Sequence, residues 1–300
     1  MKYNVLIIGY GSIGKRHYSI LKEQKNIQNI YFYTKQKIHN SIKNLNEIKK
    51  LNINYFVICS ETNKHLNQIK WIDNNFKNIK VLVEKPLFHL YKNLKFNNNK
   101  YFVGFNMRFN PIINFLKKLT SNKNIYNVNI ICSSYLPFWR NKNYKKSYSA
   151  SKSKGGGVLL DLSHDLDYIY YMFGKYKVTH SVVKKLSNLD INVEDYANVA
   201  CVGEQKNIHI NFNLNYFSKL PIRILNIEGN NISIFADLID KYVTVINKKG
   251  IKQKKVFKFD RNFTYKEQHQ CILNNKSKNI SKFNDGLYIN KIINNIKKIS

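Results

Sequence analysis

A short apolar run near the start of the chain leads directly into a glycine motif that is typical of the turn between a β-strand and an α-helix. The run Val5–Ile8 predicts a β-strand, and Gly9-Tyr10-Gly11-Ser12-Ile13-Gly14 follows it at once. In this spacing the first glycine permits a tight turn, the second lets backbone approach a pyrophosphate, and the third lets a helix pack against the strand. The start of that helix would offer N–H groups and partial positive charge to phosphates.

The motif therefore predicts a dinucleotide site. The residues expected to contact the dinucleotide phosphates are Gly9, Gly11, Ser12, Ile13 and Gly14. Its position after a strand and before a helix is the context that the motif requires. The alternative is a glycine-rich turn in some other α/β protein.

The rhythm of apolar and amphipathic segments predicts two domains. Over residues 1–120, strands alternate with helices, which is typical of a doubly wound parallel sheet. The strands expected there are Val5–Ile8, Ile30–Tyr33, Tyr55–Cys59, Val81–Val83 and Tyr101–Phe105, and the helices are Ser12–Gln24, Asn63–Asn74 and 111–120. We therefore expect an α/β protein whose first domain, residues 1–120, is a Rossmann domain.

Over residues 121–300, apolar runs follow one another with short turns and predict an α+β domain with an open, mostly antiparallel sheet. The expected strands are Val128–Ser134, Val178–Leu186, Tyr196–Val202, Ile208–Tyr216, Ile222–Glu228, Ile232–Ala236, Tyr242–Ile246 and Lys254–Phe259. One helix, Val158–Phe173, interrupts this series, and a helical pair over residues 264–275 and 285–298 ends it.

The formal net charge of +32 raises the question of a nucleic-acid partner. Of the 50 basic residues, 45 are lysine, and they are spread along the chain. Sequence-specific readers of nucleic acid depend on the planar fork of arginine, so we expect no specific nucleic-acid partner. If DNA binding did occur, it would show steep salt dependence and a sequence preference. A general positive potential would instead attract an anionic substrate.

The apolar runs and the cysteines bear on the cellular location of the protein. No run reaches the roughly 18 residues of a membrane span, and the N-terminal run lacks the features of a signal peptide. We therefore expect a cytoplasmic protein without a membrane partner. Cys59, Cys132, Cys201 and Cys271 form no CxxC pair, so they predict buried free thiols, with no metal site and no disulfide.

The end of the second strand bears on the choice of dinucleotide. NAD enzymes usually carry an acidic residue there, which binds the ribose 2′-hydroxyl. This chain has Thr34-Lys35-Gln36-Lys37 instead. Because lysine attracts a 2′-phosphate, we expect NADP(H) rather than NAD(H), with contacts from Thr34, Lys35 and Lys37. The alternative is that these lysines reflect only the lysine-rich composition.

Five motifs in order along the chain resemble the Gfo/Idh/MocA family, the glucose–fructose oxidoreductase and inositol dehydrogenase group. The segments that resemble its GxGxxGxxH, TPNxxH, EKP, GYxxRF and GGGxxxDxxxHxxD motifs are Gly9–His17, Ser60–His65, Glu84-Lys85-Pro86, Gly104–Phe109 and Gly155–Asp167. Glu61 replaces the proline of the second motif. In the last motif His164 follows Asp161 by three positions, whereas the spacing in the family is usually four.

The resemblance implies a Rossmann domain and a C-terminal α/β domain whose open sheet forms one wall of the active site and an interface in a homo-oligomer. It implies an NAD(P)-dependent dehydrogenase or reductase acting on a CH–OH group of a sugar, amino sugar, nucleotide sugar or cyclitol. The branch most resembled is linked to surface-polysaccharide and amino-sugar pathways. The further cofactor contacts that the resemblance implies are Ser60, Thr62, Asn63, His65, Glu84 and Lys85.

Hydride transfer from an alcohol needs a group that takes the hydroxyl proton. Lys85 follows a strand end, where ligands of open α/β folds bind, and a partly desolvated lysine can exchange protons there. Asp161 and His164 lie three apart on the expected helix, so the histidine could act as acid–base with the carboxylate beside it. The alternatives are a surface lysine and a structural histidine, and Asp167 is expected to be structural.

An aromatic and basic loop precedes the triple glycine. Its aromatic faces suit a sugar ring and its arginine suits an anionic group. The expected substrate contacts are Arg108, Trp139, Arg140 and Tyr148. The alternative is that Trp139 and the tyrosines pack between the domains. For the whole chain, the alternative function is a dinucleotide-binding regulatory protein that has lost catalysis.

Overall fold

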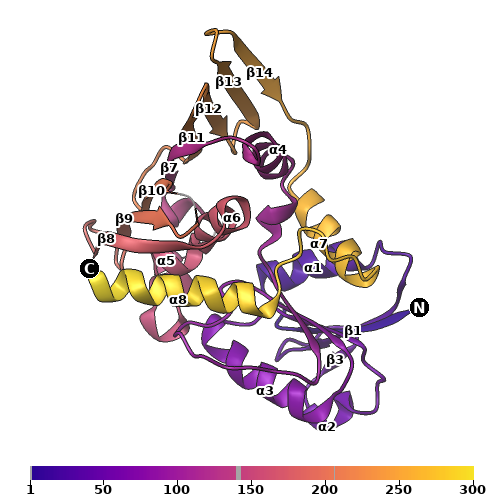
Figure 1. Cartoon of the computed structure of the whole chain (residues 1–300). Helices are drawn as coiled ribbons and strands as arrows, with labels where there is room; N and C mark the ends of the chain where they lie inside the picture. Colours follow the sequence, from indigo (N-terminus) through magenta and orange to yellow (C-terminus); the bar gives the residue numbers. More distant parts are fainter. Residues whose placement is uncertain (1, 140–142, 206) are drawn as a thin grey trace. The chain divides into compact units, whose positions relative to one another are not determined.

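The computed structural model describes residues 2–139, 143–205 and 207–300 (Figure 1). Its internal contacts divide the chain into two units. The first comprises Met1–Phe109 and Asp260–Asn290, and the second comprises Asn110–Phe259 and Lys291–Ser300. Residues 260–290 thus pack with the first unit, although the sequence pattern placed them in the second domain.

The first unit is built on a six-stranded sheet in the order β3-β2-β1-β4-β5-β6, and all of its pairings are parallel. Its strands are β1 (Tyr3–Ile8), β2 (Ile27–Tyr33), β3 (Ser41–Ile42), β4 (Tyr55–Ile58), β5 (Lys80–Val83) and β6 (Lys100–Val103). The order changes direction beside β1, and open α/β sheets bind ligands at such a point, outside the carboxyl ends of their strands. The predicted doubly wound sheet is confirmed.

Helices cover both faces of this sheet. They are α1 (Ser12–Leu21), α2 (Leu45–Ile48), α3 (His65–Asn75) and α7 (Phe263–Leu273). Figure 1 shows α1 and α7 on one side of the sheet and α2 and α3 on the other. The short elements β3 and α2 were not predicted, because the segment between residues 35 and 54 is too polar to show a clear period.

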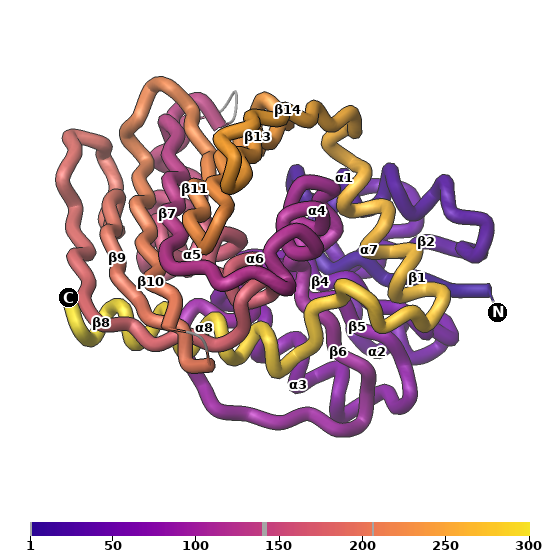
Figure 2. Tube along the Cα trace, turned by 45° about the horizontal axis from the view of Figure 1, so that its top comes forward, coloured from indigo at the N-terminus to yellow at the C-terminus, as the bar shows by residue number. Residues whose placement is uncertain are grey.

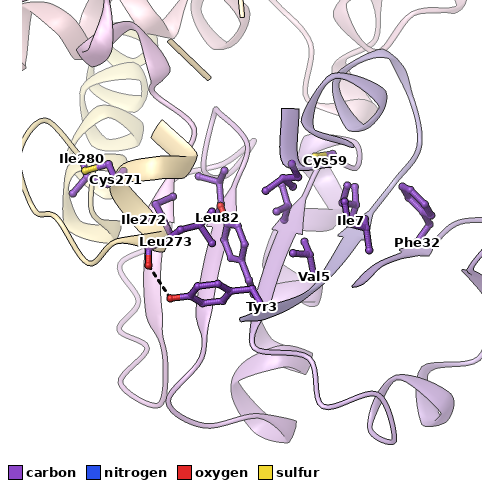
Figure 3. Close-up of a cluster of buried hydrophobic side chains, with 14 of the residues drawn as sticks. Tyr3, Val5, Ile7, Phe32, Cys59, Leu82, Cys271, Ile272, Leu273 and Ile280 are labelled. Carbon is purple, nitrogen blue, oxygen red and sulfur yellow. Dashed lines mark hydrogen bonds between the residues drawn. The ribbon is translucent and has the colours of Figure 1, made fainter. Parts of the chain in front are cut away.

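Apolar side chains of α7 complete the core of the first unit. Cys271, Ile272 and Leu273 belong to the same buried cluster as Val5 and Ile7 of β1 (Figure 3). Burial of such side chains contributes roughly 1.5–3 kcal/mol each. Part of the core of the parallel sheet therefore comes from a helix far along the chain.

Polar groups hold the C-terminal end of α7. The Tyr3 hydroxyl donates to the Leu273 carbonyl at 2.9 Å (Figure 3). The ammonium of Lys80 donates to the Tyr3 hydroxyl at 2.6 Å and to the Ile272 carbonyl at 2.7 Å. The last carbonyls of a helix have no partner within the helix, and a cation is favoured there. Lys80 therefore anchors α7 to β5.

The second unit contains an eight-stranded sheet in the order β14-β13-β12-β11-β7-β10-β9-β8 (Figure 2). Its strands are β7 (Ile125–Ser133), β8 (Tyr176–Lys184), β9 (Tyr196–Gly203), β10 (His209–Asn215), β11 (Ile222–Gly229), β12 (Ile232–Asp237), β13 (Tyr242–Asn247) and β14 (Lys252–Val256). Only the β7–β10 pairing is parallel among those described. The predicted mostly antiparallel sheet is confirmed, although β14 begins and ends earlier than expected.

The helices of the second unit are α4 (Pro111–Thr120), α5 (Val158–Asp161) and α6 (Ser163–Phe173), and α8 (Phe283–Ile299) ends there. The single helix predicted over Val158–Phe173 is wrong, because Leu162 leaves helical geometry with φ −91° and ψ 18°. Ser163 and Asp165 follow the break, and both residue types favour the first turn of a helix over its interior. Asp161 and His164 therefore do not share the face of one continuous helix.

All four cysteines are buried and free, which confirms the predicted thiols. Among the described residues, none of the helices combines the length and the apolarity needed to span a bilayer.

Candidate functional site

The glycine turn between β1 and α1 gives each of its three glycines a different role. Gly9 has φ +94°, and its N–H donates to the Tyr33 carbonyl at 3.0 Å. A Cβ added at Gly14 would lie 2.2 Å from the Gly9 carbonyl oxygen, so this position requires glycine. A Cβ at Gly11 would meet nothing within 4 Å. The turn is thus tight at Gly9, closely packed at Gly14 and open at Gly11.

The open glycine lies at the start of α1. Gly11 is the N-cap residue of this helix, and within the described chain no side chain caps its first N–H groups. The first turn contains no acidic residue, and both Gly11 and Ser12 are exposed. Free N–H groups and the positive end of the helix dipole form a ready site for phosphates. The residues present therefore fit a dinucleotide pyrophosphate.

The loop after β2 lies beside the glycine turn. The Gln36 side chain donates to the Tyr10 carbonyl at 3.1 Å, and the Gln36 N–H donates to the Thr34 hydroxyl at 3.3 Å. Lys35 and Lys37 are exposed on either side of Gln36. The structure thus brings the predicted ribose-side residues to the edge of the phosphate site, with two cations and no carboxylate in this loop.

The loop after β5 carries Glu84 and Lys85. The Glu84 side chain is buried, and its Oε2 accepts the N–H of Lys85 at 3.2 Å. A Cβ at Gly104 would lie 2.8 Å from Glu84 Oε1, so the carboxylate occupies space that only glycine leaves open. Lys85 itself is half-buried, and the Lys85–Pro86 peptide bond is cis. Glu84 therefore holds the backbone at the proposed proton-transfer lysine.

Two histidines and a tyrosine lie behind Glu84. His17 Nε2 lies 2.9 Å from Glu84 Oε1, and His17 Nδ1 lies 2.7 Å from His269 Nε2. His269 Nδ1 lies 2.8 Å from the Tyr55 hydroxyl. Burial lowers the pKa of His269 well below its ordinary value and raises that of Tyr55. Sequence reasoning missed His269 and Tyr55, because only His17 lies in a recognised motif.

His65 links two loops at the carboxyl edge of the sheet. Its Nε2 lies 3.1 Å from the Ser60 carbonyl oxygen, and its Nδ1 lies 3.2 Å from the Pro86 carbonyl oxygen. Burial lowers the pKa of His65, while its contacts with the backbone carbonyls oppose that shift. Thr62 is buried and Asn63 is half-buried in the same loop. His65 therefore ties the loop after β4 to the loop that carries Lys85, and the cofactor contacts expected of this loop stay predictions.

In the second unit, Tyr216 connects two of the residues singled out from the sequence. Its hydroxyl donates to Asp161 Oδ2 at 2.6 Å, and its ring lies edge-on to that of Trp139, with 5.2 Å between centroids. The Trp139 indole N–H donates to the Ser134 hydroxyl at 2.9 Å. Burial, then Asp161, raises the pKa of Tyr216, and Tyr148 adds to the shift. Tyr216 is the last residue of a predicted strand, and nothing in the sequence indicated that its hydroxyl bonds to Asp161.

His164 lies directly after the helix break and is half-buried. The next carboxylate, Asp165, is fully buried and accepts Arg223 Nη2 at 2.7 Å and Nε at 3.1 Å. The Tyr168 hydroxyl also donates to it at 2.5 Å. Asp165 is therefore an internal anchor near the start of α6, one position after His164.

The predicted substrate arginines have different outcomes. Arg108 is buried in the first unit, where its Nη1 lies 3.2 Å from Asp285 Oδ2. This ion pair compensates the charge of Arg108 within the first unit, and the predicted contact with an anionic substrate stays a prediction. Arg140 lies outside the described residues. Within those residues, no group of three or more His, Cys, Asp or Glu is arranged to hold a metal ion.

The fold and the glycine turn together define a two-domain protein with a dinucleotide-binding parallel sheet. Residues 3–104 match the family model described as an oxidoreductase family, NAD-binding Rossmann fold. Residues 117–299 match the model of the oxidoreductase family, C-terminal alpha/beta domain. The chain therefore belongs to the Gfo/Idh/MocA oxidoreductase family. No curated protein is similar enough in sequence to match it.

Solved structures resemble this chain over nearly its whole length. Levoglucosan dehydrogenase in complex with NADH has 16% identity and a TM-score of 0.84, covering 100% of this chain and 98% of its own. An Agrobacterium radiobacter oxidoreductase in complex with NAD⁺, L-tartaric acid and magnesium has 14% identity and a TM-score of 0.81, covering 99% and 96%. The WlbA dehydrogenase from Bordetella pertussis, in complex with NADH and UDP-GlcNAcA, has 13% identity and a TM-score of 0.76, covering 99% and 97%. At these identities the likeness establishes the fold.

Proposed function

We propose that this protein is an NADP(H)-preferring dehydrogenase or reductase that acts on a secondary alcohol of a sugar, nucleotide sugar or cyclitol. The observation that carries the proposal is the open Gly11 position at the uncapped start of α1. A turn of this geometry accepts the paired phosphates of a dinucleotide, and no packing contact requires glycine at position 11. In this proposal the first unit binds the dinucleotide and the second binds the substrate.

The preference for NADP(H) rests on the loop after β2. Lys35 and Lys37 are exposed beside the glycine turn, and Thr34 supplies a hydroxyl. A carboxylate in this loop would repel a 2′-phosphate, whereas the two ammonium groups attract it. The similar structures described above hold NAD⁺ or NADH, so this chain would differ from them at the adenosine ribose.

The substrate class is inferred from two of the similar structures. One is named as a levoglucosan dehydrogenase and another contains UDP-GlcNAcA. The formal net charge of +32 favours an anionic member of this class, such as a nucleotide sugar or a sugar acid. The half-buried rings of Trp139 and Tyr148 would lie against the sugar ring.

When bound, the nicotinamide ring supplies the hydride chemistry. The chain must then move the hydroxyl proton, and we assign this task to Lys85, with His164 as the acid–base of the second unit. Glu84 orients the backbone of Lys85, while Asp161 is held by Tyr216. In the oxidative direction the Lys85 amine would take the alcohol proton and become an ammonium ion.

A larger assembly belongs to the same proposal. Strand β7 carries Tyr126 and Ile131, which are 50% and 36% exposed. Exposed apolar side chains on a sheet face are suited to contact with a second copy. We expect light scattering to give a homo-oligomer, and Ile131→Lys to reduce the measured mass. A monomeric wild-type protein would refute this part.

Nicotinamide absorbance during turnover tests the proposed reaction. The purified protein is titrated with NADPH and NADH, then offered sugars, sugar acids and nucleotide sugars. Lys85→Met and His164→Ala are expected to lower kcat at least about 100-fold, in line with the loss of a general acid–base, while NADPH still binds. Lys92→Met removes an exposed lysine of the same segment and should leave turnover unchanged. Dinucleotide binding without turnover on any substrate class would favour the regulatory alternative.

A further inference from the structure

Four buried polar groups in the first unit form one continuous chain. It runs from Glu84 through His17 and His269 to Tyr55, with successive separations of 2.9, 2.7 and 2.8 Å. His17, His269 and Tyr55 are completely buried, and Glu84 is 7% exposed. Polar groups sequestered from water are costly unless every partner is satisfied, so such a chain specifies its geometry strongly.

Only one placement of protons satisfies the whole chain when Glu84 carries its negative charge and the rings are neutral. The carboxylate can only accept, so His17 Nε2 must carry the proton. His17 Nδ1 is then an acceptor, which requires a proton on His269 Nε2. His269 Nδ1 is in turn an acceptor, and the Tyr55 hydroxyl donates to it. The Glu84 carboxylate therefore fixes the tautomer of both histidines, and the Tyr55 hydroxyl supplies the last donor of the series.

The far end of Glu84 is what makes this chain relevant to the site. Oε1 of its carboxylate faces His17, while Oε2 accepts the backbone N–H of Lys85. A carboxylate held at one oxygen cannot rotate freely, so its other oxygen is directed at Lys85. Through this series of hydrogen bonds, the positions of Tyr55 and His269 constrain the backbone of Lys85, the residue that we assign to proton transfer.

His269 lies on α7, and the first unit holds this helix at both ends. The Asn106 amide donates to the Thr264 hydroxyl at 2.7 Å, and Lys80 donates to the Ile272 carbonyl at 2.7 Å. In between, the Gln268 amide donates to the Val103 carbonyl at 3.3 Å. These contacts attach α7 to the rest of the first unit at both ends and in the middle, and they position His269 beside His17.

We propose that His269 and Tyr55 are positioning residues for catalysis, acting on Lys85 through His17 and Glu84. This inference rests on the proposed function, because the hydrogen-bonded series matters for catalysis only if Lys85 transfers the proton. It gives α7, which lies far along the chain, a part in positioning the proposed catalytic lysine of the first unit. Neither residue touches substrate in this proposal. Removing either one should therefore lower kcat and make the backbone at Lys85 less ordered.

Paired substitutions at His269 test the proposal. Glutamine can donate through its amide to His17 Nδ1 and accept from the Tyr55 hydroxyl, whereas leucine can do neither. His269→Leu should lower kcat at least tenfold with the Kd for NADPH unchanged within twofold, and His269→Gln should recover most of that loss. Tyr55→Phe, which removes only one hydroxyl, should give a smaller loss and a shifted pH–rate profile. Cys271→Ala, a buried change on the same helix, should leave kcat unchanged.

Hydrogen exchange of the Lys85 amide, followed by NMR, gives a readout that does not depend on turnover. The proposal expects faster exchange in His269→Leu and in Tyr55→Phe, and near-normal exchange in His269→Gln and Cys271→Ala. If the wild-type protein turns over no substrate while this pattern is seen, the proposed function fails and the positioning role stands. Unchanged Lys85 protection in both His269→Leu and Tyr55→Phe would overturn the inference, as would equal kcat losses in the two His269 variants.

Discussion

The Nδ1 atom of His17 lies 2.7 Å from Nε2 of His269, although 252 positions separate the two residues in the chain. His17 lies on the helix that follows the glycine turn, and His269 lies on α7. The contact joins the first and last parts of the first unit. It is one of the contacts that join residues 260–290 to that unit, and it underlies the first of four predictions.

Stability should depend on pH through two buried histidines. Burial lowers the pKa of His65 and, further, that of His269. Below the unfolded-state pKa of about 6.5 the unfolded chain binds protons that the folded chain excludes, so the free energy of unfolding falls as pH decreases. The slope should reach at most about 1.4 kcal/mol per pH unit for each histidine.

Urea unfolding at about pH 7.5, 6.5 and 5.5 measures this slope. Full stability is expected at the highest of these values and a progressive loss at the lower two. His269→Gln removes one titrating group and should flatten the dependence. A wild-type free energy of unfolding that stays constant over the whole range would contradict the prediction.

Gly11 and Gly14 should respond to alanine in opposite ways. A Cβ at Gly11 meets nothing within 4 Å, so Gly11→Ala should change stability by less than about 1 kcal/mol. The same methyl would stand where phosphates approach, so the Kd for NADPH should rise at least tenfold. At Gly14 the Cβ would lie 2.2 Å from the Gly9 carbonyl oxygen, and destabilisation by about 1–3 kcal/mol or more is expected. Tight NADPH binding by Gly11→Ala would remove the phosphate site from its proposed place.

The loop after β2 should decide between the two dinucleotides. Lys35→Glu places a carboxylate beside the expected 2′-phosphate, so the ratio of NADPH to NADH affinity should fall about tenfold or more, equivalent to roughly 1.4 kcal/mol. Lys49→Glu, at an exposed position outside this loop, makes the same change in net charge and serves as the control. Both ratios come from fluorescence titration. Equal effects of the two substitutions would show that only the overall charge matters.

Tyr216→Phe should destabilise the second unit without any change in shape. The substitution removes the donor to Asp161 Oδ2 and leaves that carboxylate oxygen without its 2.6 Å partner. A lost hydrogen bond to a buried charged group costs about 1.5–3 kcal/mol. Urea unfolding measures the loss, and Tyr242→Phe on the partly exposed face of β13 is the matched control. A loss no larger than that of the control would mean that Asp161 does not depend on Tyr216.

Much of the first unit was predictable because its signals are local. An apolar run followed by Gly9–Gly14 can be recognised within a few residues, and the hydrophobic period predicts the strand–helix alternation up to Phe109 apart from β3 and α2. The same applies to Glu84 and Lys85 at the end of a strand. Each of these depends on neighbours in the chain, which a sequence displays directly.

Other parts of the site depend on which distant residues meet. The sequence identified Arg108 as a cation but could not show that Asp285 already neutralises it. Tyr55 and Tyr216 looked like ordinary strand residues until folding buried their hydroxyls against His269 and Asp161.

The amino-acid sequence by itself determined the parallel and antiparallel sheets, the dinucleotide motif and the family. The tertiary structure alone decided that α7 belongs to the first unit, and that its histidine meets His17. The reason is physical: local pattern sets how each segment buries its apolar face, but the partner of a buried polar group is chosen by long-range packing. Hydrogen bonds between such groups leave no period or spacing in the sequence.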